Sequence, residues 1–184
     1  MVIIVLISSQ KYIFDIGFGA EGFTFPLPLV YNRAQQNIAP SRIRLVRDWI
    51  PEQEAKREEH KVWMYQYQRS EHDRWETQYC FIDQEFLPQD FEIMNYWTSV
   101  GRTSWFTQVV IVVKFLMDED GKEVVGQLIL NGNVVKRRIK GETEVLKECK
   151  SEQERVKALE EVFGIRLEKE EREGIKGLVT ELKG

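Results

Sequence analysis

The fold is decided by the stretch KVWMYQYQRSEHDRWETQYCFI, residues 61–82. Two runs rich in aromatic residues, Lys61–Gln68 and Arg74–Ile82, flank a polar segment, and this pattern predicts a β-hairpin. The two-residue period of a strand places the aromatic side chains of the first run on one face and Val62 and Met64 on the other. Those aromatic residues are Trp63, Tyr65 and Tyr67. Bulky side chains on both faces favour a closed or sandwiched sheet, such as a small barrel.

Shorter strand signals precede this hairpin. The pattern predicts two strands, Val2–Ile7 and Tyr12–Asp15, joined by a turn, and weak alternation around Ile43–Leu45 predicts a third. A glycine-rich loop and the segment Phe25–Leu29 lie between them. Residues 1–88 are therefore predicted to form a mostly antiparallel, barrel-like β domain.

The second half of the chain mixes strand and helix patterns. Apolar residues at a spacing of three predict a short amphipathic helix over Gln89–Ser99. The apolar run within Trp105–Met117 predicts a central strand that is covered on both faces. An Asn-Gly dipeptide, a strong hairpin signal, joins Glu123–Leu130 to Asn133–Ile139 and completes a three-stranded meander.

The C-terminal part has a helical pattern. Ser151 and Glu154 form a capping box, which marks the start of a helix over Glu152–Phe163 that ends at a glycine. Glu168–Leu182 is a weaker helical candidate, because two glycines interrupt it. These helices and the preceding sheet predict an α/β domain over residues 89–184, and the fold class of the whole chain is α+β.

Composition excludes several classes of function. The 184 residues carry a net charge of −4, which argues against a general nucleic-acid binder. No apolar run reaches about 18 residues, so no membrane partner is expected. Two cysteines favour a reducing, cytoplasmic location. Two histidines are few ligands for a metal site, so no metal cofactor is expected.

The cysteines and histidines offer little chemistry of their own. Cys80 lies in mid-strand and is predicted to be buried and inert, whereas Cys149 is interpreted as incidental. His60 and His72 fall in charged segments and are expected to be exposed. Because no Cys-x-x-Cys or His-x-x-x-His spacing is present, neither residue type indicates a site by its pattern.

Asp15 is the most informative single residue, because it ends an apolar strand and opens a glycine-rich turn. A carboxylate in that position must be paired or hydrogen-bonded. It could cap the loop amides, which this residue alone favours, or it could orient a histidine imidazole as the third member of a catalytic triad. Gly17, Gly19 and Gly22 match the spacing of a dinucleotide-binding loop, but no helix follows. They are therefore interpreted as a tight turn or a close backbone approach to a ligand.

The segment NYWTSVGRTSWF, residues 95–106, combines a helix end with an arginine and several hydroxyl groups. Free backbone amides together with Arg102, Thr103 and Ser104 could hold phosphate oxygens. The pattern by itself favours a plain helix-to-strand turn and leaves a phosphate site as the alternative.

Several segments resemble, in order along the chain, the motifs of one known family. They are Phe14–Gly19 (FDIGFG), Pro26–Leu29 (PLPL), Asp90–Asn95 (DFEIMN), Thr103–Phe106 (TSWF), Leu130–Gly132 (LNG), Gly141–Thr143 (GET) and Val162–Ile165 (VFGI). Each motif alone is modest evidence of a relationship, but the ordered set of motifs covers nearly the whole chain. On these motifs the chain resembles the arylamine N-acetyltransferases.

The resemblance implies acetyl transfer from acetyl-CoA to an arylamine or hydrazine through a Cys–His–Asp triad, with the second domain as a lid. Asp15 matches the triad aspartate, and Phe18 and Gly19 match the acceptor-lining part of the family motif. Trp97 replaces what is often a tyrosine in the family. The positions that match the family's coenzyme A contacts are Trp97, Thr103 and Ser104.

The cysteine and histidine of the family's triad have no match in this chain. We therefore expect residues 1–184 to represent the later two-thirds of such an enzyme, as a truncated product, a partial gene model or one half of a split protein, and to be inactive alone. The apolar strand Val2–Ile7 would then be covered by a complementing N-terminal domain or by self-association. Two alternatives stay open: a non-catalytic binding or interaction module on the same scaffold, and an unrelated small barrel that binds an apolar ligand.

Overall fold

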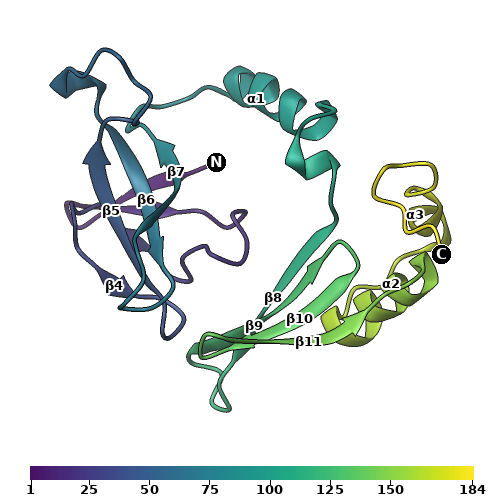
Figure 1. Ribbon diagram of the computed structural model, residues 1–184. Helices are drawn as coiled ribbons and strands as arrows, with labels where there is room; N and C mark the ends of the chain where they lie inside the picture. The colour runs from purple at the N-terminus through teal and green to yellow at the C-terminus, as the bar shows by residue number, and fades with distance from the viewer. The chain divides into compact units, whose positions relative to one another are not determined.

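The computed structural model describes residues 1–184, which form two compact units, Met1–Gln84 and Glu85–Gly184 (Figure 1). The sequence pattern predicts a boundary after residue 88, and the structure divides the chain after Gln84. Each unit has a hydrophobic core of its own. The α+β fold class is confirmed, because antiparallel sheets occur together with helices.

The first unit begins with a three-stranded antiparallel sheet in the order β1–β2–β3. Its strands are β1 (Ile3–Ile7), β2 (Gln10–Phe14) and β3 (Leu27–Pro28). The turn between β1 and β2 consists of Ser8 and Ser9, whose φ angles of 47° and 67° are both positive, as a type I′ turn requires. Both strands predicted at the start of the chain are therefore present.

A second sheet, in the order β4–β5–β6–β7, completes the first unit. Its elements are β4 (Gln35–Gln36), β5 (Arg42–Asp48), the 3₁₀ turn η1 (Glu58–His60), β6 (Val62–Gln68) and β7 (Glu76–Phe81). The predicted hairpin is confirmed as β6 and β7. The predicted barrel is not, because no ladder joins the two sheets. The edge strands β3 and β4 explain why the two sheets do not join. Each strand has only two residues, and Pro28 in β3 lacks the backbone N–H that a ladder needs.

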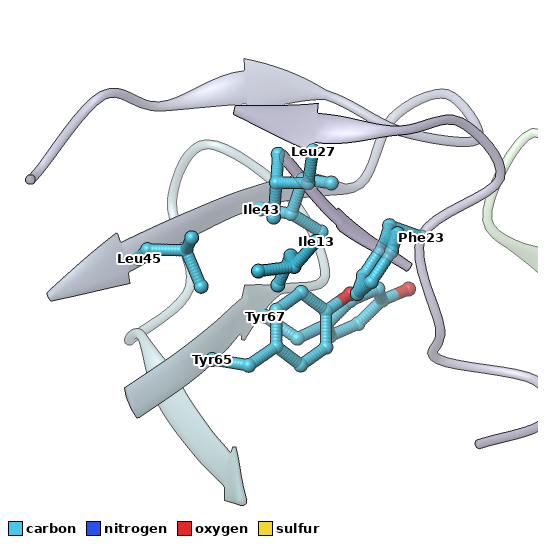
Figure 2. Close-up of a cluster of buried hydrophobic side chains, with 7 residues drawn as sticks. All are labelled: Ile13, Phe23, Leu27, Ile43, Leu45, Tyr65 and Tyr67. Carbon is cyan, nitrogen blue, oxygen red and sulfur yellow. The ribbon is translucent and has the colours of Figure 1, made fainter. Parts of the chain in front are cut away.

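The core of the first unit contains side chains from both sheets (Figure 2). Its buried members are Ile13, Phe23, Leu27, Ile43, Leu45, Tyr65 and Tyr67. Trp63 packs against this cluster, so the aromatic face predicted for β6 is its core face. Each fully buried side chain of this size contributes about 1.5–3 kcal/mol. The packing therefore fixes β2 and β6 relative to each other, and these strands position the candidate site.

The second unit contains a four-stranded antiparallel meander in the order β11–β10–β9–β8, where three strands were predicted. Its strands are β8 (Ile111–Met117), β9 (Val124–Asn131), β10 (Val134–Ile139) and β11 (Glu142–Glu148). Before the sheet come α1 (Pro88–Val100) and the 3₁₀ turn η2 (Trp105–Thr107). The predicted strand over 105–117 therefore begins only at Ile111. β11 was missed because its charged sequence ETEVLKE lies on the exposed edge of the sheet.

The strand β8 is not covered on both faces, which corrects the expectation for its apolar run. Lys114, Phe115 and Met117 are exposed. The second core packs against one face of the sheet, where Leu130 and Val135 meet the C-terminal helical segment. An apolar run is therefore compatible with a sheet that is packed on one face only.

The first helical stretch spans the predicted residues Glu152–Phe163, whereas the second is shorter than predicted. The C-terminal helical segment consists of α2 (Glu152–Ala158), the π-helical turn η3 (Leu159–Phe163) and α3 (Lys169–Glu173). The hydroxyl of Ser151 accepts a hydrogen bond from the Glu154 N–H at 3.3 Å, and Gly164 has a φ of 76°. Only five residues of the second helical candidate are helical, because Gly174 and Gly177 follow. Cys149 is not incidental: it is a buried member of the second core.

Candidate functional site

Asp15 follows the last residue of β2 and is half-buried. Its Oδ1 atom accepts a hydrogen bond from the Gly17 N–H at 3.3 Å, so the carboxylate does cap the loop that follows the strand. One amide leaves most of the acceptor capacity of the two carboxylate oxygens unused. The capping role and a role in orienting another donor are therefore compatible.

Tyr79 on β7 is the neighbour of Asp15 that sequence reasoning missed. Its hydroxyl oxygen is buried and makes no hydrogen bond of ordinary length and angle. Burial raises the pKa of Tyr79 above its usual range, and the nearby Asp15 carboxylate raises this pKa further as a negative charge and as an acceptor. The phenol therefore stays protonated and can donate. The available signal was the register of the hairpin, which places Tyr79 opposite Tyr65.

An aromatic wall, formed by Phe18, Tyr65 and Tyr79, stands beside the carboxylate. The ring centroids of Phe18 and Tyr79 are 5.0 Å apart, and those of Tyr65 and Tyr79 are 5.3 Å apart. Phe18 meets Tyr65 edge-on at 6.1 Å. Such separations are typical of favourable aromatic pairs. Asp15, Phe18 and Gly19 thus lie in one part of the first unit, beside these aromatic rings.

The glycine loop is held in place by two side chains of the same unit. The Tyr65 hydroxyl donates to the Glu21 carbonyl at 2.7 Å, and the Asn37 side-chain amide donates to the Gly22 carbonyl at 2.9 Å. Gly19 has a φ of +100°, which favours glycine, and its carbonyl accepts from the Gly22 N–H at 3.1 Å. The glycines therefore form a tight turn, and no helix follows them, so the dinucleotide-loop spacing has no structural counterpart.

The cysteines and histidines do not complete a triad at Asp15. Cys80 is exposed, which corrects the prediction that it is buried. It is adjacent to Tyr79 on a strand, so its side chain points to the opposite face and away from Asp15. His60 bonds through Nδ1 to the Ala55 carbonyl at 3.0 Å, and the exposed His72 lies in the turn between β6 and β7.

The three residues matched to coenzyme A contacts cluster at the end of α1 in the second unit. Trp97 is 60% exposed, and its ring lies close to Gly101, where an added Cβ would be 3.2 Å from two ring carbons. Thr103 is exposed, whereas Ser104 is buried and its hydroxyl donates to the Thr98 carbonyl at 2.8 Å. Trp97 and Thr103 are thus free for a ligand, and Ser104 holds the turn.

Neither a metal centre nor a spanning helix is present in the structure. No group of three or more His, Cys, Asp or Glu side chains is placed to hold a metal ion. No helix is long and apolar enough to cross a membrane.

Sequence comparisons identify relatives across most of the chain. A family model described as N-acetyltransferase matches residues 1–172. N-malonyltransferase FDB2 of Fusarium pseudograminearum is 34% identical over 181 residues, which are 95% of this chain and 53% of that protein. Its namesake from Gibberella moniliformis is 35% identical over 180 residues, 95% of this chain and 52% of that protein. The chain spans about half the length of these curated relatives.

Solved structures share the fold. Arylamine N-acetyltransferase from Salmonella typhimurium superposes with a TM-score of 0.70 at 24% identity, over 89% of this chain and 53% of that one. Mycobacterium marinum arylamine N-acetyltransferase in complex with CoA gives a TM-score of 0.70 at 22% identity, with the same coverage. Since the family model covers most of the residues, this chain belongs to the arylamine N-acetyltransferase family.

Proposed function

We propose that this chain supplies the carboxylate and the acceptor wall of an N-acyltransferase that moves an acyl group from coenzyme A to an arylamine or hydrazine. The observation that carries the proposal is the half-buried Asp15 carboxylate beside the rings of Phe18 and Tyr79, at a position that matches the family's motif. An aromatic amine would stack on this wall with its nitrogen near the carboxylate.

In this proposal Asp15 is a positioning residue. It accepts the N–H of an imidazole, which fixes the tautomer of the ring and stabilises its positive charge after the ring takes a proton from a cysteine thiol. The thiolate attacks the acyl thioester, a new thioester forms on cysteine, and coenzyme A leaves with the proton. The amine then attacks the cysteine thioester and regenerates the thiol. We propose that the cysteine and the imidazole come from a part of the enzyme other than residues 1–184.

A turnover assay tests whether the thiols and imidazoles of this chain support acyl transfer. Residues 1–184 are incubated with acetyl-CoA and an aromatic amine, and release of the coenzyme A thiol is followed. The expected rate is the buffer background, since Cys80 points away from Asp15. Turnover that Cys80→Ala abolishes would contradict the proposal.

Ligand binding tests the acceptor wall without turnover. Phe18→Ala should weaken binding of aniline several-fold in an NMR titration, because it removes one stacking surface. Ile16→Ala is the matched control, since this neighbour in the same loop is exposed and forms no part of the wall. Equal effects of the two substitutions would contradict an acceptor role for Phe18.

Coenzyme A binding is proposed for the turn after α1, with Trp97 and Thr103 as direct contacts and Ser104 as a residue that supports them. Calorimetric titration of the chain should give heat with coenzyme A in the millimolar range, and Thr103→Val should reduce the affinity. The absence of heat at about 1 mM ligand would contradict this binding role.

A second acyl donor is a candidate beside acetyl-CoA. The two curated relatives described above, which align over 95% of this chain, are named N-malonyltransferases, whereas the two arylamine N-acetyltransferase structures described above are at most 24% identical. We therefore propose malonyl-CoA as the alternative donor to acetyl-CoA. Tighter calorimetric binding of malonyl-CoA than of acetyl-CoA would favour it, and equal affinities would leave no preference in this part of the enzyme.

A non-catalytic module on the same scaffold is the alternative function. Free thiols at Cys80 and Cys149 fit the proposed reducing, cytoplasmic location in either case. If the chain is a non-catalytic module, a longer form of the protein that contains a cysteine and a histidine should still lack turnover. If the chain is part of an enzyme, such a form should be active, and Asp15→Asn should abolish its turnover. The second result separates the two functions.

A further inference from the structure

The glycine loop after β2, residues 17–22, is built around the ring of Tyr65. Phe18 near the start of this loop meets the Tyr65 ring edge-on at 6.1 Å. Phe23, just after the loop, meets the same ring at 5.4 Å, and Figure 2 shows these two side chains in the first core. Between them, the Glu21 carbonyl accepts a hydrogen bond from the Tyr65 hydroxyl. The Phe18 ring of the proposed acceptor wall therefore belongs to a loop that is fixed at several points.

The backbone beside Phe18 does not fix its ring. Gly19 has a φ of +100°, and a Cβ added at Gly17 or Gly19 would have no atom within 4 Å. Because glycines adopt many backbone conformations, a side chain between two of them needs contacts from elsewhere to keep its place. Phe18 is only partly buried, and the rings of Tyr65 and Tyr79 pack against its ring. The position of its Cβ therefore depends on the backbone that lies behind it.

Gly22 is the residue behind Phe18. A Cβ added at Gly22 would lie 3.6 Å from the Phe18 Cβ and 3.1 Å from the Gly19 carbonyl oxygen. The Gly22 N–H also donates to this carbonyl at 3.1 Å. The backbone of Gly22 can approach so closely because it has no side chain. A displacement of Gly22 would therefore be transmitted directly to Phe18.

Asn37 holds Gly22 through its side-chain amide. Its Nδ2 atom donates to the Gly22 carbonyl at 2.9 Å, and its Oδ1 atom accepts from the Thr24 N–H and from the Thr24 hydroxyl, both at 3.2 Å. The Asn37 N–H in turn donates to the Ser41 carbonyl at 3.0 Å, which ties the residue to the turn before β5. The nitrogen and the oxygen of one amide therefore fasten the end of the glycine loop to another part of the first unit.

We propose that Asn37 is a positioning residue for the acceptor wall, which acts through Gly22 and holds the Phe18 ring where an aromatic amine can stack on it. This inference rests on the proposed function and deepens it. The amide is required because the Gly22 carbonyl needs a donor while the Thr24 N–H needs an acceptor. A carboxylate at position 37 would keep the acceptor but would place an oxygen against the Gly22 carbonyl, with no proton between them.

Amide hydrogen exchange tests this hold on the loop without a ligand. In Asn37→Asp, the Gly22 N–H should exchange at least about fivefold faster than in the parent chain, because the Gly22 carbonyl has lost its donor. Gln36→Glu is the matched control: it makes the same change from amide to carboxylate at the exposed neighbour. It should leave this exchange unchanged. Exchange of Gly22 at the parent rate in Asn37→Asp would overturn the proposal.

An NMR titration with aniline tests the effect on binding. Asn37→Asp should weaken aniline binding several-fold, and by no more than Phe18→Ala does, because it acts through the Phe18 ring. Added to Phe18→Ala, it should therefore cause no further loss. A purely structural role would weaken binding in both backgrounds, so an equal loss with and without the Phe18 ring would contradict positioning.

Gly22→Ala is the second variant. It leaves the side chain of Asn37 unchanged and presses on the Gly19 carbonyl, so it should also weaken aniline binding. Circular dichroism shows whether each variant is folded, and if Asn37→Asp is not, unchanged binding in Gly22→Ala overturns the proposal. The two levels of failure differ. A parent chain that does not bind aniline would contradict the proposed function and the role of Asn37 with it, whereas aniline binding that Asn37→Asp leaves unchanged would contradict the role of Asn37 alone.

Discussion

Arg155 has the largest fully buried side chain, with 1% of the residue exposed. Its Nη2 atom lies 2.5 Å from Glu152, and it donates to the carbonyls of Gly132 at 3.2 Å and Thr180 at 2.9 Å. Arg155→Ala leaves a partly buried carboxylate and two carbonyls without their donor. The free energy of unfolding of the second unit should fall by about 3–5 kcal/mol, measured by urea denaturation.

The control for this prediction is an exposed ion pair of the same type. Arg166 lies 2.9 Å from Glu160 and its side chain is 83% exposed. Arg166→Ala should change the free energy of unfolding by less than about 1 kcal/mol, since water replaces the lost contact. A similar loss for both arginines would show that burial does not set the strength of the Arg155 interactions.

At the candidate site the sequence could identify single residues but not their neighbours. Asp15 was predictable because a carboxylate at the end of an apolar strand needs a partner. Tyr79 was not, because its role depends on the loop after β2 and the strand β7, which are more than sixty residues apart in the chain. Cys80 was assigned to the wrong environment, because alternation along an edge strand exposes one face.

The α1–η2 turn is the element on which the proposed coenzyme contacts depend. An alanine at Gly101 would place its Cβ 2.6 Å from the Trp97 carbonyl oxygen, so the helix end must shift. The Gly101 carbonyl also accepts from the Thr107 hydroxyl at 2.9 Å. Gly101→Ala should loosen this turn by about 1–3 kcal/mol, seen as amide exchange at least about tenfold faster over residues 101–108.

Gly174→Ala is the matched control in the same unit. Its Cβ would come no closer than 3.4 Å to another atom, and its backbone is already right-handed helical, with a φ of −61°. Exchange in residues 101–108 should therefore stay unchanged. Unchanged exchange in Gly101→Ala as well would show that the turn can accommodate a Cβ and that glycine is not needed beside Trp97.

Elements were predictable where local pattern and packing agree. The hairpin β6–β7 and the cap at Ser151 follow from alternation and from one hydrogen bond, and both are present. β11 is a strand because β10 offers it a ladder, although its own sequence is polar and exposed. The apolar pattern also did not predict that β8 starts at Ile111, because a hydrogen-bonded turn around Ser104 and Thr107 occupies the preceding residues.

At the scale of the whole molecule, the two cores share no residue. Each unit therefore has the packing needed to unfold in a transition of its own, and a single free energy of unfolding need not describe the chain. The reactivity of the two thiols can report on the unfolding of each unit separately, because Cys80 lies in the first unit and Cys149 in the second.

The thiols should differ in reactivity in the native chain. Burial raises the pKa of the Cys149 thiol, and packing in the second core shields its sulfur from reagents until that unit opens. With a disulfide reagent at neutral pH, Cys80 should react at least about a hundredfold faster than Cys149. Cys80→Ser should leave only the slow thiol. In a urea titration, Cys149 should become reactive together with the loss of β8–β11 rather than with exposure of the tyrosines in the first core. Two equally fast thiols without denaturant would show that the second core is open in the isolated chain.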